Sequence, residues 1–210
     1  DALGRHGIVA EVESLVAMPL ASRRRAVLTA VVRGGRVTLG YHAAGTHDVV
    51  DIASCPVLRP EIVAALDGLR AAAAILAAGE GSVRLTVLAT DTGLDVVASE
   101  GAGKLSATGR QRLAELCAAA GWARLSIDAD LVVIIREPRL ELAGVTVRPP
   151  PGAFVQAVAE AEARMQTIVA DAAKAARRVA DLFSGIGAFA LPIARRARVV
   201  AFDSDAAALA

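Results

Sequence analysis

Residues 179–203, VADLFSGIGAFALPIARRARVVAFD, decide how this chain folds and are the starting point for its interpretation. An apolar run reaches Asp181 and gives way to Gly185 and Gly187, after which an amphipathic helix can begin. A second apolar run over 199–202 ends on Asp203. This order predicts strand, glycine turn, helix, strand and acid, which is the opening unit of a nucleotide-type cofactor site.

The side chains of this unit indicate which cofactor it suits. Glycines let backbone amides approach a ligand at a helix N-terminus, and Asp203 is placed to accept hydrogen bonds from ribose hydroxyls. The spacing Gly185-x-Gly187-x-x-Ala190 also fits the dinucleotide fingerprint, but a carboxylate at Asp181 would repel a pyrophosphate. S-adenosylmethionine has no phosphate and carries an ammonium and a sulfonium. The stretch therefore favours S-adenosylmethionine, with a dinucleotide or a βαβ turn without a ligand as the alternatives.

Length and composition set the broad class. The chain has 210 residues, of which 55% are hydrophobic, enough to bury the core of one or two domains. The net charge of +1 does not by itself indicate nucleic acid. Two cysteines exclude a disulfide framework and suit a reducing cytosol. No stretch resembles a signal peptide or a membrane span, and we expect a cytoplasmic monomer without a membrane partner.

The first part of the chain alternates short β-rich runs with two helical segments. Helices are predicted over 60–78 and 106–120, and a weak strand over 8–16. The remaining strands are predicted over 25–33, 36–41, 49–52, 83–89, 94–98, 123–127, 131–135 and 140–147. Glycine turns join several of these runs, so we expect hairpins rather than βαβ crossovers.

The run of prolines at 149–151 cannot be helix or central strand and marks a junction. A helix over 155–176 then leads into the glycine unit. We predict an α+β central domain of antiparallel strands and two helices over 1–148. The first part of a Rossmann-like, doubly wound α/β domain follows over 149–210. Because the chain starts without Met and stops inside a new helix, we expect it to be a fragment.

Three segments resemble bacterial S-adenosylmethionine-dependent RNA uracil-5 methyltransferases. PPGAFVQA at 150–157 resembles the family segment P-x-x-F-x-Q-x-N, and DLFSGIGAFALP at 181–192 resembles D-L-[FY]-[CS]-G-x-G-x-F-[ST]-L-P. Upstream, the pieces SRRRA, GYH and VDIASCPVL at 22–26, 40–42 and 50–58 follow one another. They resemble Y-R-R-R-A-R, G-F-R and I-V-D-x-x-x-C-P-I-L of the branch that modifies large-subunit (23S) ribosomal RNA. The likeness spans roughly residues 20–210.

The resemblance implies roles for individual residues of the cofactor half. Gln156 matches a glutamine that contacts the cofactor, Phe183 and Gly185 match the loop that lines it, and Asp203 matches the acid that holds the ribose. Ala188 stands where family members often carry Asn or Thr, so one polar contact is absent. A solvated Gln156 and a Phe183 that serves only the core remain alternatives.

The resemblance also implies a role for Cys55, as one ligand of a [4Fe–4S] cluster. Such a cluster normally takes four thiolates, and the other three, in C-x5-C-x2-C, would precede Asp1. A structural cysteine before a proline turn is the alternative. Cys117 shares a helical face with Leu113 and Leu116 and is expected in the core.

Arg23, Arg24 and Arg25 stand at the start of a predicted strand and place charge on both of its faces. Phosphate contact with RNA is the interpretation that the resemblance favours, and the planar guanidinium suits it. A solvated strand start is the alternative.

The implied reaction is covalent. A cysteine thiolate adds to C6 of a uracil held out of its RNA stack, C5 takes the methyl group, and a base removes the C5 proton. In the family the nucleophile follows D-P-P-R-x-G and the base is a later Glu, so we expect both beyond Ala210 and no catalytic residue within this chain. The alternatives are a transfer RNA enzyme, a fragment of an NAD-dependent oxidoreductase, and a non-catalytic RNA-binding protein on the same scaffold.

Overall fold

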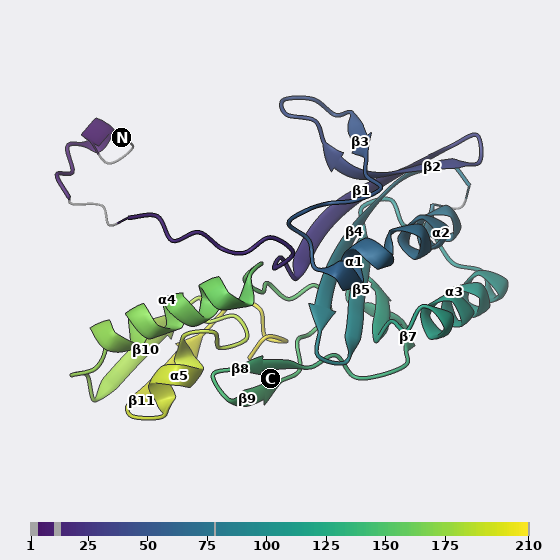
Figure 1. The fold of residues 1–210 in the computed structure, drawn as a ribbon. Helices are drawn as coiled ribbons and strands as arrows, with labels where there is room; N and C mark the ends of the chain where they lie inside the picture. The colour runs from purple at the N-terminus through teal and green to yellow at the C-terminus, as the bar shows by residue number, and fades with distance from the viewer. Residues whose placement is uncertain (1–3, 11–13, 78, 210) are drawn as a thin grey trace.

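The structure is a computed structural model that describes residues 4–10, 14–77 and 79–209. Its largest element is a seven-stranded sheet in the order β3-β2-β1-β4-β5-β6-β7 (Figure 1). The strands are β1 (Arg25–Arg33), β2 (Arg36–His42), β3 (Val49–Asp51), β4 (Gly81–Thr90), β5 (Gly93–Ser99), β6 (Arg124–Ile127) and β7 (Asp130–Ile134). A short 3-10 helix, Gly4–His6, precedes them, while 8–10 and 14–16 contain no strand and 11–13 lie outside the described residues.

Two of the predicted hairpins are confirmed. β1 pairs antiparallel with β2 across Gly34 and Gly35, and β4 pairs antiparallel with β5. Inward positions of β1 alternate with outward ones, as in a strand with one face on the core. The core-facing side carries Ala26, Leu28 and Ala30, each at most 1% exposed.

The prediction that hairpins alone join the strands is wrong at one place. β5 and β6 are parallel, and helix α3 (Ala107–Ala119) crosses between them. Parallel neighbours require a crossover of about a dozen residues or more, which α3 supplies. Its Leu113 and Cys117 are fully buried against the sheet. The sheet is therefore mixed rather than antiparallel.

Helices cover one face of this sheet. The segment predicted as one helix is divided at Ala65 into α1 (Pro60–Ala64) and α2 (Leu66–Leu76), and α2 packs against β1, β2 and α3. The Ser106 hydroxyl caps α3 by accepting a hydrogen bond from the Gly109 amide at 3.0 Å. The core lies between these helices and the central strands.

The second part of the chain starts with a small hairpin. Residues 140–147, predicted as one strand, form β8 (Leu140–Leu142) and β9 (Val145–Val147). The error has a local cause, because Ala143 and Gly144 both have positive φ, +50° and +76°, and reverse the chain in two residues.

A helix and a parallel pair of strands complete the chain (Figure 1). They are α4 (Ala159–Ala172), β10 (Arg178–Leu182), α5 (Ala190–Ala194) and β11 (Arg198–Phe202). The parallel pairing of β10 with β11 confirms the predicted βαβ unit. α4 begins later than predicted, because Val158 is extended and forms a bridge with Arg23, and the Ala157 carbonyl accepts a hydrogen bond from the Arg24 amide.

A second buried cluster connects the parts. Leu140 and Leu142 of the hairpin pack with Leu88 of β4, Val155 of the junction and Ile186 of the glycine turn. The hairpin thus lies before the expected boundary at 148/149 but packs on residues that follow it. Among the described residues, no helix is long and apolar enough to cross a bilayer.

Candidate cofactor site

The glycine turn follows β10 directly and is tied to β11. The Ser184 amide donates to the Phe202 carbonyl at 3.0 Å, so the turn lies at the carboxyl ends of both strands. Gly187 has φ +88°, and a Cβ there would lie 3.0 Å from Leu191 Cγ. The positive φ favours glycine at this position, and a larger residue would also require the Leu191 side chain to move.

Asp203 lies against this turn. Its Oδ2 accepts a hydrogen bond from the Gly185 amide at 2.7 Å, and its Oδ1 accepts one from the Asp205 amide at 2.9 Å. These amides, that of Asp205 first, hold the pKa of the Asp203 carboxyl below its usual value, so it stays charged. Because each carboxylate oxygen has a second lone pair, both oxygens can still accept from ribose hydroxyls.

Asp181 has the opposite surroundings. Burial, and then the charge of Asp203, raise the pKa of its carboxyl, while a hydrogen bond from the Ala190 amide lowers it in part. Its Oδ2 is buried and has no hydrogen-bond partner among the described residues. An oxygen in this state is stabilised by a cation or a donor group. The ammonium and sulfonium of S-adenosylmethionine fit this requirement, whereas a pyrophosphate does not.

Phe183 does not belong to the core. It is 88% exposed and has φ +67°, which is unusual for an aromatic residue. Among the described residues, Phe183 is therefore not part of a buried core, and its role at the cofactor remains a prediction. Its neighbours Ser184 and Ile186 are each 7% exposed and anchor the turn.

Gln156 and Cys55 lie on the two sides of one stretch of chain. The Arg23 amide donates to the Val57 carbonyl at 2.9 Å, and the Arg24 amide donates to the Ala157 carbonyl at 2.7 Å. Residues 21–24 thus run between the Cys55 loop and the segment that carries Gln156. Sequence positions about a hundred residues apart are brought together here.

The three adjacent arginines have three different surroundings. Arg23 is exposed, and Arg25 is half-buried with its guanidinium 5.5 Å from the centre of the Phe154 ring. Burial, and then the charge of Arg23, lower the pKa of Arg25. Arg24 is only 5% exposed and forms an ion pair with Glu162 at 2.9 Å. Its guanidinium faces the interior, so phosphate contact remains a prediction for Arg23 and Arg25 only.

Cys55 is half-buried on a loop beside the core. Within the part of the chain that the structure describes, no three metal-ligating side chains lie close enough to hold an ion. One thiolate does not satisfy a [4Fe–4S] cluster, so these residues do not form that site by themselves. Cys117 is in the core as predicted, and burial raises the pKa of its thiol to about 11.

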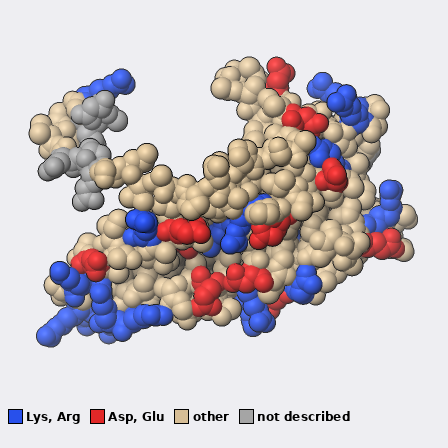
Figure 2. Space-filling view, viewed as in Figure 1, with Lys and Arg blue, Asp and Glu red and all other residues tan. Residues whose placement is uncertain are grey.

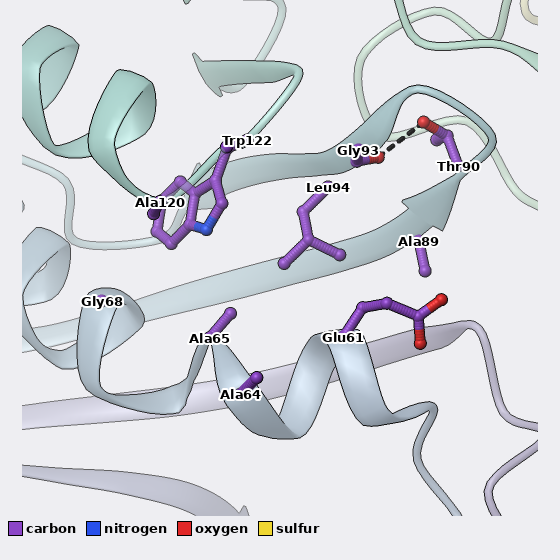
Figure 3. Close-up of a pocket in the computed structure, with 11 residues that line it drawn as sticks. Glu61, Ala64, Ala65, Gly68, Ala89, Thr90, Gly93, Leu94, Ala120 and Trp122 are labelled. Carbon is purple, nitrogen blue, oxygen red and sulfur yellow. Dashed lines mark hydrogen bonds between the residues drawn. The ribbon is translucent and has the colours of Figure 1, made fainter.

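A cleft of about 380 Å³ lies away from the glycine turn, between α1, α2 and the β4–β5 turn (Figure 3). Its walls are mostly small side chains, with Trp122 at one end and the Glu61 carboxylate at the other. No residue predicted for the cofactor, the metal or RNA lines it.

Cations gather at the other end of the βαβ unit, where β10 and β11 begin (Figure 2). The exposed members are Lys174, Arg177, Arg178, Arg195, Arg196 and Arg198. A five-residue strand separates them from the glycine turn, a distance of about 16 Å. The glycine turn itself carries the two acids Asp181 and Asp203, so the charges of this unit favour a cationic ligand at the turn.

Sequence reasoning missed two buried ion pairs. One joins Arg24 to Glu162, and the other joins Arg124 to Asp95 through both carboxylate oxygens, at 2.9 and 2.7 Å. The alternation of Glu160 and Glu162 along α4 does not reveal which of them is buried. Only the tertiary contact between Arg24, just before β1, and Glu162 of α4 decides it.

Known proteins similar to this chain were found by sequence and by fold. It is 45% identical over 209 residues to an RNA methyltransferase of Brucella suis, covering 100% of this chain and 50% of that protein. It is 33% identical over 205 residues to the 23S rRNA (uracil(1939)-C(5))-methyltransferase RlmD of Pectobacterium atrosepticum, covering 92% of this chain and 45% of that protein. The chain thus spans about half the length of the curated relatives it matches. No family model matches.

A solved structure supports the fold. The tRNA (uracil-54, C5)-methyltransferase of Pyrococcus abyssi, in complex with S-adenosyl-L-homocysteine, matches with a TM-score of 0.72 at 19% identity. The match covers 99% of this chain and 54% of that one. The sheet, the junction and the βαβ unit therefore form a known methyltransferase arrangement. The chain belongs to the RNA methyltransferase family of the relatives matched by sequence, among them the Pectobacterium enzyme.

Proposed function

We propose that this chain supplies the RNA-facing domain and the first part of the cofactor pocket of an RNA uracil-5 methyltransferase. The methyl group comes from S-adenosylmethionine and is transferred to C5 of a uridine. The nucleophile and the base are contributed by residues outside this chain.

One observation carries the cofactor assignment. Asp181 and Asp203 converge on a glycine turn at the carboxyl ends of two parallel strands, and a buried oxygen of Asp181 has no hydrogen-bond partner among the residues that the structure describes. Ligands of open α/β sheets bind at this edge. Two carboxylates there favour a cofactor with an ammonium and a sulfonium over a dinucleotide with a pyrophosphate.

Ribosomal RNA is the proposed substrate class. The C-P-V-L segment at 55–58 favours the ribosomal branch, and the similarity to the Pectobacterium enzyme supports the same choice. Arg23 and the Arg25–Phe154 pair offer cationic and aromatic groups to RNA at the edge of the junction.

Methylation by the full-length protein tests the proposal. Purified protein is incubated with radiolabelled S-adenosylmethionine and with transcripts of either 23S ribosomal RNA or transfer RNA, and the nucleosides are identified by mass spectrometry. We expect 5-methyluridine in ribosomal transcripts. Label in transfer RNA alone would change the substrate class. Binding of NADH without binding of S-adenosylmethionine would support the oxidoreductase alternative instead.

We also propose that Cys55 is one ligand of a [4Fe–4S] cluster whose other thiolates lie outside this chain. Its loop runs beside residues 21–23, which places the cysteine next to the N-terminal segment. Iron content and visible absorbance of the anaerobically purified full-length protein test this, with Cys55→Ser expected to lower both. Wild-type protein without iron would leave Cys55 as a structural residue.

A further inference from the structure

We propose that Arg24 is a positioning residue that sets the conformation of the junction segment, residues 149–157, and with it the place of Gln156. The inference rests on the proposed function, because it assigns Arg24 a part in forming the cofactor pocket rather than in contacting RNA. It concerns how the two parts of the chain are held together at the site.

Arg24 reaches the junction segment through both its backbone and its side chain. Its amide donates to the Ala157 carbonyl at 2.7 Å, and its Nε donates to the Gln156 carbonyl at 3.1 Å. Its Nη2 donates to Glu162 Oε1 at 2.9 Å, in the first turn of α4. One arginine therefore holds the residues on both sides of the start of α4.

A second buried arginine holds the other end of the junction segment. Arg124 donates from Nη2 to the Pro149 carbonyl at 2.8 Å, while its Nε and Nη2 bind the two oxygens of Asp95. Arg24 directly precedes β1 and Arg124 is the first residue of β6, both in the large sheet's part of the chain, and both are at most 9% exposed. The junction segment is thus fixed at its two ends by buried, charge-neutralised guanidinium groups, and Gln156 lies at one of these ends.

The hydrogen bonds that Arg24 and Arg124 donate to backbone carbonyls explain why these two charged side chains are buried. Isolated buried ion pairs contribute little net stability, because desolvation offsets the attraction. A guanidinium, however, has a rigid fork of five donors and can bind a carboxylate and a backbone carbonyl together. Lysine has no such fork. The proposed role of Arg24 therefore depends on the shape of the guanidinium group as well as on its charge, and only arginine has this shape.

The first test separates positioning from folding. In the full-length protein, Arg24→Lys keeps the charge opposite Glu162 but has no separate Nε–H to donate to the Gln156 carbonyl. The double variant Arg24→Met with Glu162→Met removes both charges, a change that buried pairs often tolerate. We expect both variants to unfold near the wild-type urea midpoint. Their KM for S-adenosylmethionine should rise roughly three- to tenfold, the effect of one lost hydrogen bond.

Combining Arg24→Lys with Gln156→Ala separates a positioning role from a merely structural one, because only positioning through Gln156 makes the effects of the two substitutions on KM overlap. If Arg24 acts through Gln156, adding Gln156→Ala to Arg24→Lys should raise KM no further than Gln156→Ala alone. Independent, multiplying effects would contradict the positioning role, as would a wild-type KM in a stably folded Arg24→Lys protein.

Arg23→Ala is the matched control, because this neighbour is exposed and is proposed to contact phosphate. The logarithm of the RNA association constant falls linearly with the logarithm of the salt concentration. The steepness of this fall should decrease by about 0.7 for each single-strand phosphate contact that is removed. We expect that loss for Arg23→Ala and an unchanged slope for Arg24→Lys and the Met double variant. A lower slope for the Met double variant would make Arg24 a phosphate ligand. If the wild-type protein binds no S-adenosylmethionine, the proposed function itself fails, which is a separate result.

Discussion

At the level of single residues, Asp181 and Asp203 lie at the same glycine turn, but the pKa values of their carboxyl groups are shifted in opposite directions. Backbone amides keep the pKa of Asp203 low, whereas burial and the neighbouring charge raise the pKa of Asp181. Asp203 is therefore ionised wherever Asp181 titrates. Asp203 accepts the hydrogen bond of the Gly185 amide, whereas Asp181 has a buried oxygen without a hydrogen-bond partner in the described part of the chain.

Replacing Asp203 with Ala should weaken S-adenosylmethionine binding by the full-length protein about tenfold or more, since a charge-assisted acceptor for the ribose is lost. Calorimetry measures this, with Asp203→Asn as the matched variant that keeps one acceptor oxygen and should lose less affinity. Unchanged affinity for Asp203→Ala would contradict the ribose role.

Cofactor affinity should rise with pH through the raised pKa of Asp181, which lies above the usual value of 3.8. Only the ionised carboxylate attracts the cationic groups of the cofactor. The same shift means that the folded state loses stability as pH rises from 3.8 through the raised value, because the folded state binds the proton more tightly. Asp181→Asn should abolish both the rise in cofactor affinity and the loss of folding stability that Asp181 causes over this pH range. An affinity that is flat with pH in the wild type would exclude Asp181 from cofactor binding.

At the level of elements, the strand–turn–helix unit depends on its two glycines to different degrees. Gly185 has φ +52°, and a Cβ added there would meet no atom of the described residues within 4 Å, whereas at Gly187, with φ +88°, an added Cβ would contact Leu191. Gly185→Ala should destabilise the folded state by about 1 kcal/mol, the cost of a left-handed alanine. Gly187→Ala should cost more, because Leu191 must also move. Urea unfolding measures both, and equal values would mean that the Leu191 contact relaxes freely.

At the level of the whole molecule, the hairpin β8–β9 joins the large sheet to the cofactor unit. Leu142 is 1% exposed in the cluster that contains Leu88 and Ile186, and the Arg195 guanidinium donates to the Ala143 carbonyl. This contact means that the glycine turn is supported from the central domain and not only from β10 and α5.

Leu142→Ala should therefore destabilise the protein by about 2–4 kcal/mol through the cavity it leaves. It should also weaken cofactor binding, because Ile186 loses its support. Val145→Ala, in the same hairpin at a residue 39% exposed, is the matched control and should change stability by less than about 1 kcal/mol. A Leu142→Ala protein with normal cofactor affinity would show that the glycine turn is independent of the hairpin.

Much of the fold followed from local patterns. The strand ends at Asp181 and Asp203, the hairpin at Gly34 and Gly35, and the helix around Cys117 are marked by apolar period and glycine placement, which act within a few residues. The same local signals misjudged residues 140–147 and 155–158. The two-residue turn at Ala143 and the pairing of Ala157 with Arg24 oppose the apparent period.

What the sequence by itself determined is the chemistry of the cofactor turn, because its glycines, acids and strands lie within 25 consecutive residues. What only the tertiary structure decided is the role of each charged residue. Arg23, Arg24 and Arg25 are adjacent and chemically identical, yet one is exposed, one is buried against Glu162 and one lies over Phe154. Burial depends on which distant segment packs on each face of a strand. Here the packing residues are Phe154 of the junction and Glu162 of α4, more than 120 residues further along the chain.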